Sequence, residues 1–332
     1  MSKRTAVPAV VSVRTAVTQA LDDVPRGTVV VAACSGGPDS LALVGAAAWV
    51  AHRGGIDLHA VVIDHALQPG SAAVAADAAD AARALGAADA RVVAVDASGP
   101  GGPEAAARRA RYAALEQAAV EASAAAILLG HTREDQAETV LLRLARGSGA
   151  RSLAAMRAVS GPYRRPFLHL PRAQVRSAAD ALLAPLGRQA WADPHNEDPA
   201  FARVRVRALV EGLEAALGPG AVLGLARSAD LLRDDADALD VLATSAMAGI
   251  VSSEAGSVCA SCDALAALPR AVRTRVLRLM ALRAGALAED LGSGHVGSLE
   301  ALVSDWRGQG EVRLPGRVVG TRGYGRLCLV RS

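Results

Sequence analysis

The stretch "TVVVAACSGGPDSLALVGAAAWV", residues 28–50, is the strongest indication of the fold of this chain. Its first residues form an apolar run with the length and composition of a buried strand. The octet "ACSGGPDS" (33–40) then places two glycines, a proline and an aspartate between two serines, and a second apolar run follows. Glycines permit a tight turn, and proline suits the first turn of a helix. We therefore expect a strand, a glycine turn and a helix from about Asp39 to Arg53.

This turn predicts an anion-binding site. Backbone N–H groups converge where a chain curls through Gly36 and Gly37, and a helix N-terminus adds about half a positive charge. The Walker pattern GxxxxGK[ST] is absent, and Lys3 is the only lysine of the chain. Phosphate must therefore be met by backbone amides, hydroxyl groups and arginines. The alternative is an ordinary strand-to-helix turn with a serine cap.

Strand-like runs alternate with helical segments through the first half of the chain. The expected strands and helices, in chain order, are 28–34, 39–53, 57–65, 71–86, 90–96, 104–123, 125–131 and 134–146. This alternation predicts an α/β fold, in which helices cover both faces of a parallel sheet. Ligands of such sheets bind at the carboxyl ends of the strands.

The pattern changes after "GSG" at 147–149, and helices dominate from about residue 199. The later helical patterns and a strand-like tail fall at 172–187, 220–250, 263–284 and 311–331. We expect a larger domain over 1–217 and a smaller, mainly helical domain over 218–332 that ends in short strands.

Composition limits the class of protein. The 332 residues are 52% hydrophobic, yet the longest apolar stretches are shorter than the ~20 residues needed to span a membrane. The N-terminus lacks the pattern of a signal peptide, so we expect a cytoplasmic protein with no membrane partner. Four cysteines are too few for a disulfide framework in so long a chain. The net charge of +3 permits a polyanionic partner without requiring one.

Further motifs follow the glycine turn. They are "DHALQPGS" (64–71), "EAAARRARYAAL" (104–115), "LGHTREDQAETVLLRLARGSG" (129–149), "RRPFL" (164–168) and "WADPHNEDPAFARVRVR" (191–207). The turn itself resembles the "SGGxDS" loop of the PP-loop ATP pyrophosphatases. In this order and spacing, the whole set resembles the tRNA(Ile)-lysidine synthetase family from about residue 28 to 207. A weaker similarity extends to "LPGRVVGTRGYGRL" (314–327).

The resemblance implies a Rossmann-like PP-loop domain of the adenine nucleotide alpha hydrolase type. It also implies a reaction in two steps. ATP activates O2 of the wobble cytidine in a tRNA(Ile) with a CAU anticodon, and pyrophosphate leaves. The ε-amine of free L-lysine then attacks C2 and expels AMP, while the C-terminal domain binds the tRNA. The sequence leaves the oligomeric state open, with a homodimer as one possibility.

The resemblance also assigns residues. It implies that ATP is bound by Ser35, Gly36, Gly37, Pro38, Asp39, Ser40, Asp64 and His131. The catalytic candidates are Asp39, Arg108, Asp135, Arg203 and Arg207. The candidates for tRNA or lysine binding are Glu104, Arg111, Glu138, Asp193 and Asn196. Carboxylates at the ends of neighbouring strands suit Mg²⁺, so Asp39 and Asp135 are its expected ligands.

Several of these residues have simpler explanations. His131 suits a structural histidine at a strand end, and Arg111 suits a solvent-exposed helix face. Glu104 and Asp135 are acids near helix N-termini, where the helix dipole favours them. Three positions depart from the family pattern: Glu134 replaces an aspartate, His195 a serine and Val204 an asparagine. The last two put local hydrogen bonds near the anticodon loop in doubt.

A second set of arginines suggests a nucleic-acid surface in the C-terminal domain. The set comprises Arg270, Arg273, Arg275, Arg278, Arg283, Arg307, Arg313, Arg317, Arg322, Arg326 and Arg331. No acidic residue separates the first five along the chain, so we expect phosphate contacts with a salt dependence. A solvated arginine face is the alternative.

Two motifs compete with this interpretation. "GSGHVG" (292–297) matches a dinucleotide-binding pattern but follows a helical stretch, so we expect a helix-to-helix connector. "CASC" (259–262) is a lone CxxC, too little for a metal site by itself. Cysteine-using 2-thiocytidine-forming relatives share the PP-loop and are the first alternative function. A non-catalytic tRNA- or nucleotide-binding protein is the second.

Overall fold

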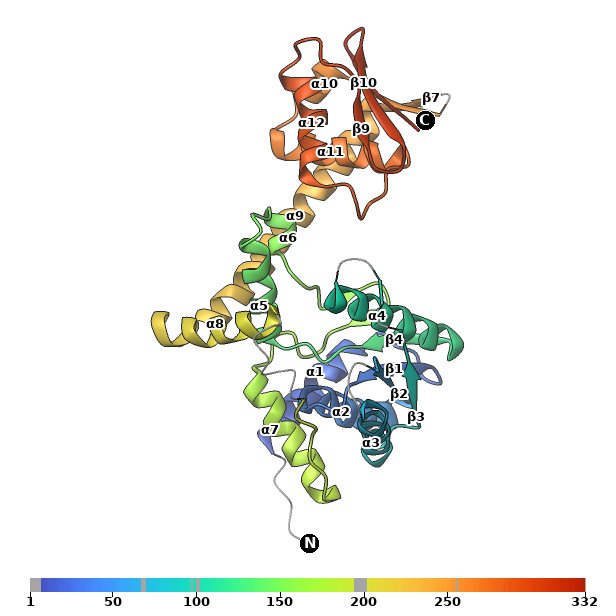
Figure 1. Cartoon of the computed structure of the whole chain (residues 1–332), viewed down its shortest axis with the longest axis vertical. Helices are drawn as coiled ribbons and strands as arrows, with labels where there is room; N and C mark the ends of the chain where they lie inside the picture. Colours follow the sequence, from blue (N-terminus) through green and yellow to red (C-terminus); the bar gives the residue numbers. More distant parts are fainter. Residues whose placement is uncertain are drawn as a thin grey trace. The chain divides into compact units, whose positions relative to one another are not determined.

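The computed structural model describes residues 7–66, 70–96, 98–99, 102–193, 202–254 and 256–331. The chain divides into two compact units, Met1–Asp230 and Leu231–Ser332. Figure 1 shows a parallel sheet flanked by helices in the first unit, and helices with an antiparallel sheet in the second. The α/β fold with a smaller C-terminal domain that the sequence predicts is therefore confirmed.

The first unit is built on a six-stranded sheet with strand order β3-β2-β1-β4-β6-β5. The strands are β1 (Val29–Cys34), β2 (Asp57–Asp64), β3 (Asp89–Ala94), β4 (Ala124–Leu128), β5 (Val159–Ser160) and β6 (Tyr163–Arg164). All neighbours run parallel except β5 and β6. The four strands expected from the sequence are present, because each is an apolar run that ends at a glycine, a polar residue or a loop. The strand order reverses at β1, which places a ligand crevice beside the carboxyl end of that strand.

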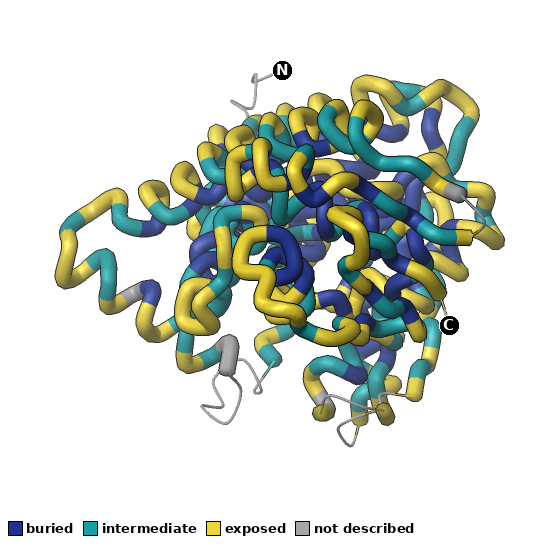
Figure 2. Tube along the Cα trace, turned by 90° about the horizontal axis from the view of Figure 1, so that it is seen from above, coloured by how far each residue is buried: buried dark blue, intermediate teal, exposed yellow. Residues whose placement is uncertain are grey.

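Helices cover both faces of this sheet. The helices of this unit are α1 (Pro8–Ala20), α2 (Pro38–Gly54), α3 (Ser71–Ala84), α4 (Pro103–Glu121), α5 (Arg133–Leu144), α6 (Ala150–Leu153), α7 (Arg172–Leu183) and α8 (Ala202–Leu217). One core joins α1, α2, α3 and α7 to the sheet, and a second core joins α4 to the opposite face. Figure 2 shows helical turns of the chain that alternate buried and exposed residues, as amphipathic helices do.

The apolar core is built from small side chains, and this allows close packing. Helix α2 buries eleven residues, most of them alanine, leucine or valine. A Cβ at Gly45 would lie 3.0 Å from the Leu182 side chain, so the glycine brings α7 close to α2. Helix α1 also packs on α2 and α7, although no sequence pattern predicted this helix.

The second unit combines the end of α9 (Ala221–Ile250) with three further helices and five strands. These are β7 (Val251–Glu254), β8 (Ser257–Ser261), α10 (Cys262–Ala266), α11 (Arg270–Arg283), α12 (Ser293–Ser304), β9 (Val312–Leu314), β10 (Val318–Gly323) and β11 (Arg326–Arg331). The antiparallel sheet has the order β7-β8-β11-β10-β9 and packs its apolar side chains against the helices. The strand-like tail is confirmed, whereas β7 and β8 are additional strands.

The cysteines differ from the sequence-based expectation. Cys259 and Cys328 form a disulfide with an S–S distance of 2.13 Å. The two residues lie directly opposite each other on β8 and β11. Cys262 is buried and free, so the two cysteines of "CASC" do not bond to each other. The spacing along the chain could not show this pairing, because it arises from the register between strands 69 residues apart.

Two other sequence patterns can be compared with the described residues. Gly292 caps α12, and the rest of "GSGHVG" forms the first turns of that helix rather than a connector. The motif follows no strand and therefore lacks the context of a dinucleotide site. In the described ranges no single helix is long and apolar enough to cross a membrane, and only α8 with α9, bent by 109°, meets that test as a pair.

Candidate active site

The glycine turn forms a compact loop between β1 and α2. Gly36 has φ +80°, a left-handed conformation that favours glycine, and Gly37 caps the helix. The Ser35 N–H donates to Ser40 Oγ at 3.0 Å, and that hydroxyl donates to the Gly37 carbonyl at 2.9 Å. The first-turn amides of α2 consequently remain directed toward a ligand at the carboxyl edge of the sheet.

Close backbone approaches fix this loop in the sheet. A Cβ at Gly36 would lie 3.1 Å from the Cβ of Ala78, and the Gly36 carbonyl accepts a hydrogen bond from the Trp191 N–H at 2.9 Å. A Cβ at Gly130 would lie 3.1 Å from the Asp39 carbonyl oxygen. The segment after β4 can therefore run directly beside the start of α2, which brings the two strand ends into one site.

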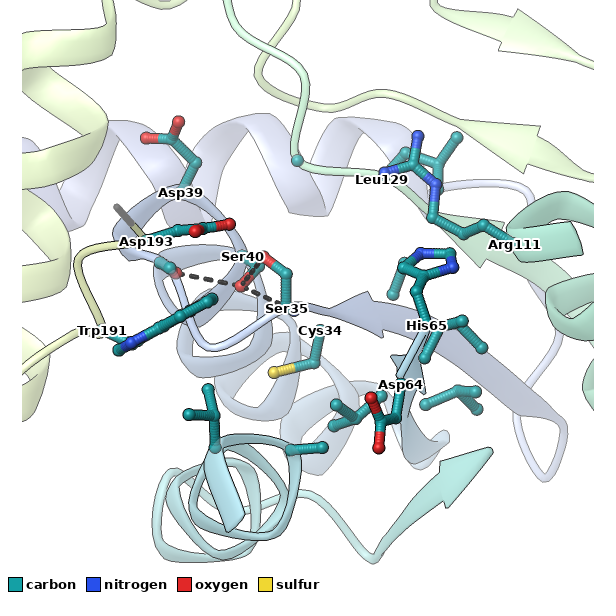
Figure 3. A pocket seen from close by; sticks show the side chains of 18 of the residues that line it. Cys34, Ser35, Asp39, Ser40, Asp64, His65, Arg111, Leu129, Trp191 and Asp193 are labelled. Carbon is teal, nitrogen blue, oxygen red and sulfur yellow. Dashed lines mark hydrogen bonds between the residues drawn. The ribbon is translucent and has the colours of Figure 1, made fainter. Parts of the chain in front are cut away.

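A pocket of about 490 Å³ opens at this edge. Figure 3 shows Ser35, Asp39 and Ser40 on one side of it and Asp64, His65 and Arg111 on the other. Asp64 is buried, and one of its oxygens accepts a hydrogen bond from the Ala66 N–H at 2.9 Å. Polar side chains thus surround a cavity whose floor consists of apolar strand residues, as in sites for small organic ligands.

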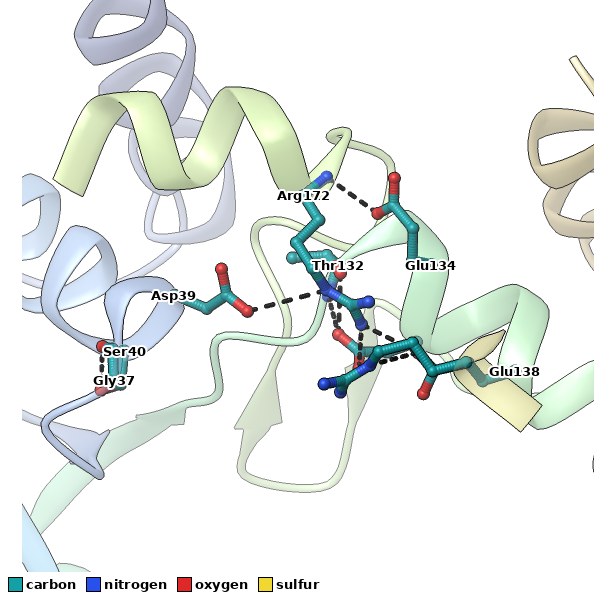
Figure 4. Close-up of polar contacts among 9 residues, drawn as sticks. Gly37, Asp39, Ser40, Thr132, Glu134, Glu138 and Arg172 are labelled. Atoms are coloured by element: carbon teal, nitrogen blue, oxygen red, sulfur yellow. Dashed lines mark hydrogen bonds and ion pairs between the residues drawn. The ribbon is translucent and has the colours of Figure 1, made fainter. Parts of the chain in front are cut away.

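A buried arginine organises the carboxylates next to this pocket (Figure 4). Arg172, at the start of α7, donates to Asp135 Oδ1 at 2.9 Å and to Glu138 Oε1 at 3.0 Å. Its Nε lies 3.9 Å from Asp39 Oδ2. Glu138 also accepts from Arg207 at 3.3 Å, and its side chain is only 6% exposed. The network ties α2, α5, α7 and α8 together by charge.

The two expected Mg²⁺ ligands differ in availability. Asp39 Oδ1 is buried and has no hydrogen-bond partner. Both oxygens of Asp135 are engaged, since Oδ2 accepts from the backbone and hydroxyl of Thr132 and Oδ1 accepts from Arg172. Mg²⁺ commonly takes one or two carboxylates together with substrate phosphates. Asp39 fits that coordination, whereas Asp135 acts here as a helix-capping and ion-pairing residue.

The electrostatics of the site follow from burial and from these charges. Burial raises the pKa of Asp39 to about 6, although Arg172 opposes this shift. Burial would also raise the pKa of Asp135, but Arg172 and the hydrogen bonds from Thr132 hold it below the ordinary value. Burial lowers the pKa of His131 to about 3, so the imidazole facing the pocket is neutral.

The structure brings most of the predicted residues to one place. The pocket is lined by Ser35, Gly37, Asp39, Ser40, Asp64, Arg111, His131, Asp135 and Asp193. Gly36 and Pro38 shape the loop, while Glu138 and Arg207 belong to the Arg172 network. Glu104 and Arg108 lie on α4 and do not line the pocket. Asn196, His195 and the side chain of Arg203 lie outside the described residues.

Three features of the site were missed by sequence reasoning. Arg172 lies within a helical pattern that gives no sign of its partners. Trp191 lines the pocket and holds the glycine turn through its backbone. Gly130 allows the approach of β4 to α2. A run of arginines without acids around Arg172 was the only available signal, and it does not indicate which arginine turns inward.

A glycine loop at the end of β1, at the reversal point of a parallel sheet, defines a PP-loop nucleotide-binding domain. The family model of the PP-loop domain matches residues 10–213, and that of the TilS substrate binding domain matches residues 261–328. The chain therefore belongs to the tRNA(Ile)-lysidine synthase family, and the resemblance inferred from its motifs is confirmed.

Curated relatives extend this similarity over the whole chain. The tRNA(Ile)-lysidine synthase of Thermobifida fusca (strain YX) is 54% identical, over 97% of this chain and 98% of its own. The one from Streptomyces coelicolor is 49% identical, over 92% and 86% respectively. Among solved structures, the U34-tRNA thiolase NcsA from Methanococcus maripaludis is similar with a TM-score of 0.55 at 17% identity. That likeness covers 68% of this chain and 79% of the thiolase, and it shows a common fold alone.

Proposed function

We propose that this chain uses ATP to join L-lysine to C2 of the wobble cytidine in a tRNA(Ile) with a CAU anticodon. The observation that carries the proposal is the glycine loop beside Asp39, whose Oδ1 is buried without a partner in the pocket. The family membership supplies the reaction class, an ATP-dependent ligation that acts on tRNA. ATP is the nucleotide expected at a PP-loop domain.

In the first step, cytidine O2 attacks the α-phosphorus of ATP, and the bond from that phosphorus to the bridging oxygen of pyrophosphate breaks. The amides of the first turn of α2 and the hydroxyls of Ser35 and Ser40 are placed to stabilise the departing pyrophosphate. Mg²⁺ held by Asp39 and the phosphates would neutralise part of the same charge. Arg203 and Arg207 stay our candidates for charge that develops in the transition state, whereas Arg108, the third candidate from the sequence, does not line the pocket and is considered below with the arginines around it.

In the second step, the lysine ε-amine forms a bond to C2, and the C2–O2 bond breaks to release AMP. The attacking amine must be neutral, so its proton has to leave before or during the attack. Glu104, Arg111, Glu138, Asp193 and Asn196 remain candidates for tRNA or lysine binding. Glu138 already accepts from two arginines, so binding lysine there would require one of these bonds to be exchanged.

The alternative functions have less support. A sulfur-transferring relative needs several cysteines or a metal cluster near the loop. Cys34 is the one cysteine that lines the described pocket, and no group of three or more His, Cys, Asp or Glu within the described ranges could hold a metal. A non-catalytic binding protein would not need the partnerless oxygen of Asp39. We further propose a cytoplasmic location, and the oligomeric state, a homodimer included, stays open.

Pyrophosphate release with defined tRNA transcripts tests the proposal. Release should occur with ATP and a tRNA(Ile) transcript carrying CAU, and it should not occur with the same transcript carrying UAU. Lysine should then convert the adenylated tRNA to product with formation of AMP. If no transcript supports release, the non-catalytic alternative gains instead; if sulfur donors replace lysine, the thiolase alternative does.

A further inference from the structure

A second positive surface lies beside the pocket, outside the residues that hold the nucleotide loop. The sequence has no acidic residue between Glu138 and Asp180. Eight arginines fall in this interval: Arg143, Arg146, Arg151, Arg157, Arg164, Arg165, Arg172 and Arg176. Any carboxylate or other anion that pairs with these arginines must therefore come from another segment of the chain or from a ligand.

Acids from other segments reach only part of this set. Arg172 is paired with the carboxylates of the site, and Arg164 donates to Asp23 at 2.9 Å. Arg143 donates to the carbonyls of Ser152 and Ala155, and Arg165 donates to the carbonyl of Arg157 at 2.8 Å. Carbonyl oxygens fix the direction of a guanidinium, but they do not cancel its charge.

Four arginines come together near the carboxyl edge of the sheet: Arg108 of α4, Arg143 of α5, Arg146 after α5 and Arg165 after β6. We call them the arginine patch. The Arg108 guanidinium lies 4.8 Å from the ring centre of Tyr112, and that of Arg165 lies 5.9 Å from the ring centre of Tyr163. The two rings meet edge to face at 5.1 Å. Burial lowers the pKa of Arg143, and the neighbouring Arg108 and Arg146 lower it further.

Within the described part of the chain, none of these four arginines forms an ion pair with a carboxylate. Arg108 Nη1 and Arg165 Nε are buried and have no hydrogen-bond partner. Arg146 is exposed. Unmatched buried guanidinium groups are costly unless an anion completes them. The arrangement thus has the character of an anion-binding surface.

We propose that the arginine patch binds backbone phosphates of the RNA substrate next to the reacting nucleotide. This proposal rests on the proposed function for the identity of the RNA. The position of the patch favours RNA rather than ATP as its ligand, because none of its four arginines lines the pocket that contains the glycine loop. Several separated guanidiniums suit successive phosphodiesters, whose contacts position a nucleic acid without reading its sequence.

The test is the salt dependence of tRNA affinity. We compare wild type with Arg146→Gln, with Arg146→Gln/Arg165→Gln and with the matched control Arg83→Gln. Arg83 is an exposed arginine of α3, on the opposite face of the sheet from α4, and is paired with Asp80. Each lost phosphate contact should weaken binding about 5- to 10-fold near 0.1 M salt and reduce the slope of log K against log salt by about one. Arg83→Gln should match wild type, and the KM for ATP should be unchanged in all variants.

The outcomes separate this inference from the proposed function. Because Arg165 is buried, melting curves check its variant, and the exposed Arg146→Gln tests the patch alone. Unchanged slopes in both variants would overturn the inference even if wild type releases pyrophosphate. A raised KM for ATP with an unchanged slope would assign the patch to ATP and also overturn it. If wild type releases no pyrophosphate with any tRNA, the proposed function fails, while the slopes still decide whether the patch binds RNA.

Discussion

The arginines of α11 and those of the arginine patch look alike in the sequence but differ in their partners. In α11, Arg273 donates to Glu300 at 2.9 Å and Arg275 donates to Asp240 at 2.9 Å. Arg278 donates to the carbonyls of Leu291 and Ala288. The acids come from α12 and α9, so a helix without acids of its own still finds carboxylate partners for part of its arginines. In the arginine patch, no carboxylate of the described residues forms an ion pair with any of the four arginines.

The number of arginines in a segment therefore says little about the affinity of that segment for an anionic ligand. A guanidinium paired with a carboxylate contributes to stability, whereas an unpaired one contributes to the binding of an anion. The phosphate contacts expected for Arg273, Arg275 and Arg278 would require internal bonds to break first. We therefore propose RNA phosphate contacts for the patch and a structural role for Arg273 and Arg275, whereas Arg278, which like Arg143 donates to carbonyls, stays a candidate for phosphate contact.

The largest expected effect is at the most fully paired arginine. Arg172→Gln should lower the turnover of adenylation by about 10²- to 10³-fold, because three carboxylates lose their common partner. Its effect on the salt slope of tRNA affinity should be negligible, since Arg172 is 11% exposed and fully engaged. Initial-rate measurements with saturating ATP and tRNA separate kcat from KM.

Two further variants make this result specific. Arg172→Lys retains the charge without the fork geometry and should recover part of the lost turnover. Arg188→Gln removes an arginine from an exposed pair with Asp77 and should change turnover little. Normal turnover in Arg172→Gln, or a salt slope reduced by one, would show that pairing in the structure does not predict function.

An intermediate effect is expected in α11. Arg275→Gln should lower the free energy of unfolding by about 1–2 kcal/mol, because it leaves the half-buried Asp240 without its arginine. Chemical denaturation measures this loss, and Arg283→Gln, at an exposed position of the same helix, serves as the control. The comparison would be reversed if Arg275→Gln kept full stability and reduced the salt slope of tRNA affinity.

The smallest effect concerns pH. Burial holds the pKa of His131 at about 3 in the folded chain, against 6.5 for a free histidine, and Arg111, Arg165 and Arg108 add to this shift. Between these two pKa values only the unfolded chain binds the proton. The free energy of unfolding therefore falls as the pH drops through about 6.5. His131→Asn should remove about 1 kcal/mol of the change between about pH 7.5 and 5.5. Denaturation at several pH values measures it, with the exposed His52→Asn as control. Equal pH dependence in His131→Asn and wild type would mean that the pKa of His131 is not lowered in the folded chain.

Local patterns were sufficient to predict the parallel sheet and the glycine loop. Each strand of β1 to β4 is an apolar run, and Gly36, Gly37 and Asp39 follow one of them in the order that a phosphate loop needs. Residues from separate motifs, such as Asp64 and His131, met in one pocket because parallel strands end at one edge.

The remaining features depend on contacts between distant segments. Strands β7 and β8 are short and rich in serine, and their place in the sheet depends on the pairing of β8 with β11 and of β7 with β8. The same register joins Cys259 to Cys328. Arg172 turns inward because α5 presents Asp135 and Glu138 to the start of α7. No spacing within the sequence contains this information.

The ATP-dependent incorporation of labelled L-lysine into a tRNA(Ile) transcript with a CAU anticodon would test the proposed function at its product. We predict lysine incorporation matched by AMP and pyrophosphate, no incorporation into the UAU transcript, and loss of all three products in Asp39→Asn with tRNA affinity retained. Pyrophosphate release without lysine incorporation, or full activity of Asp39→Asn, would contradict it.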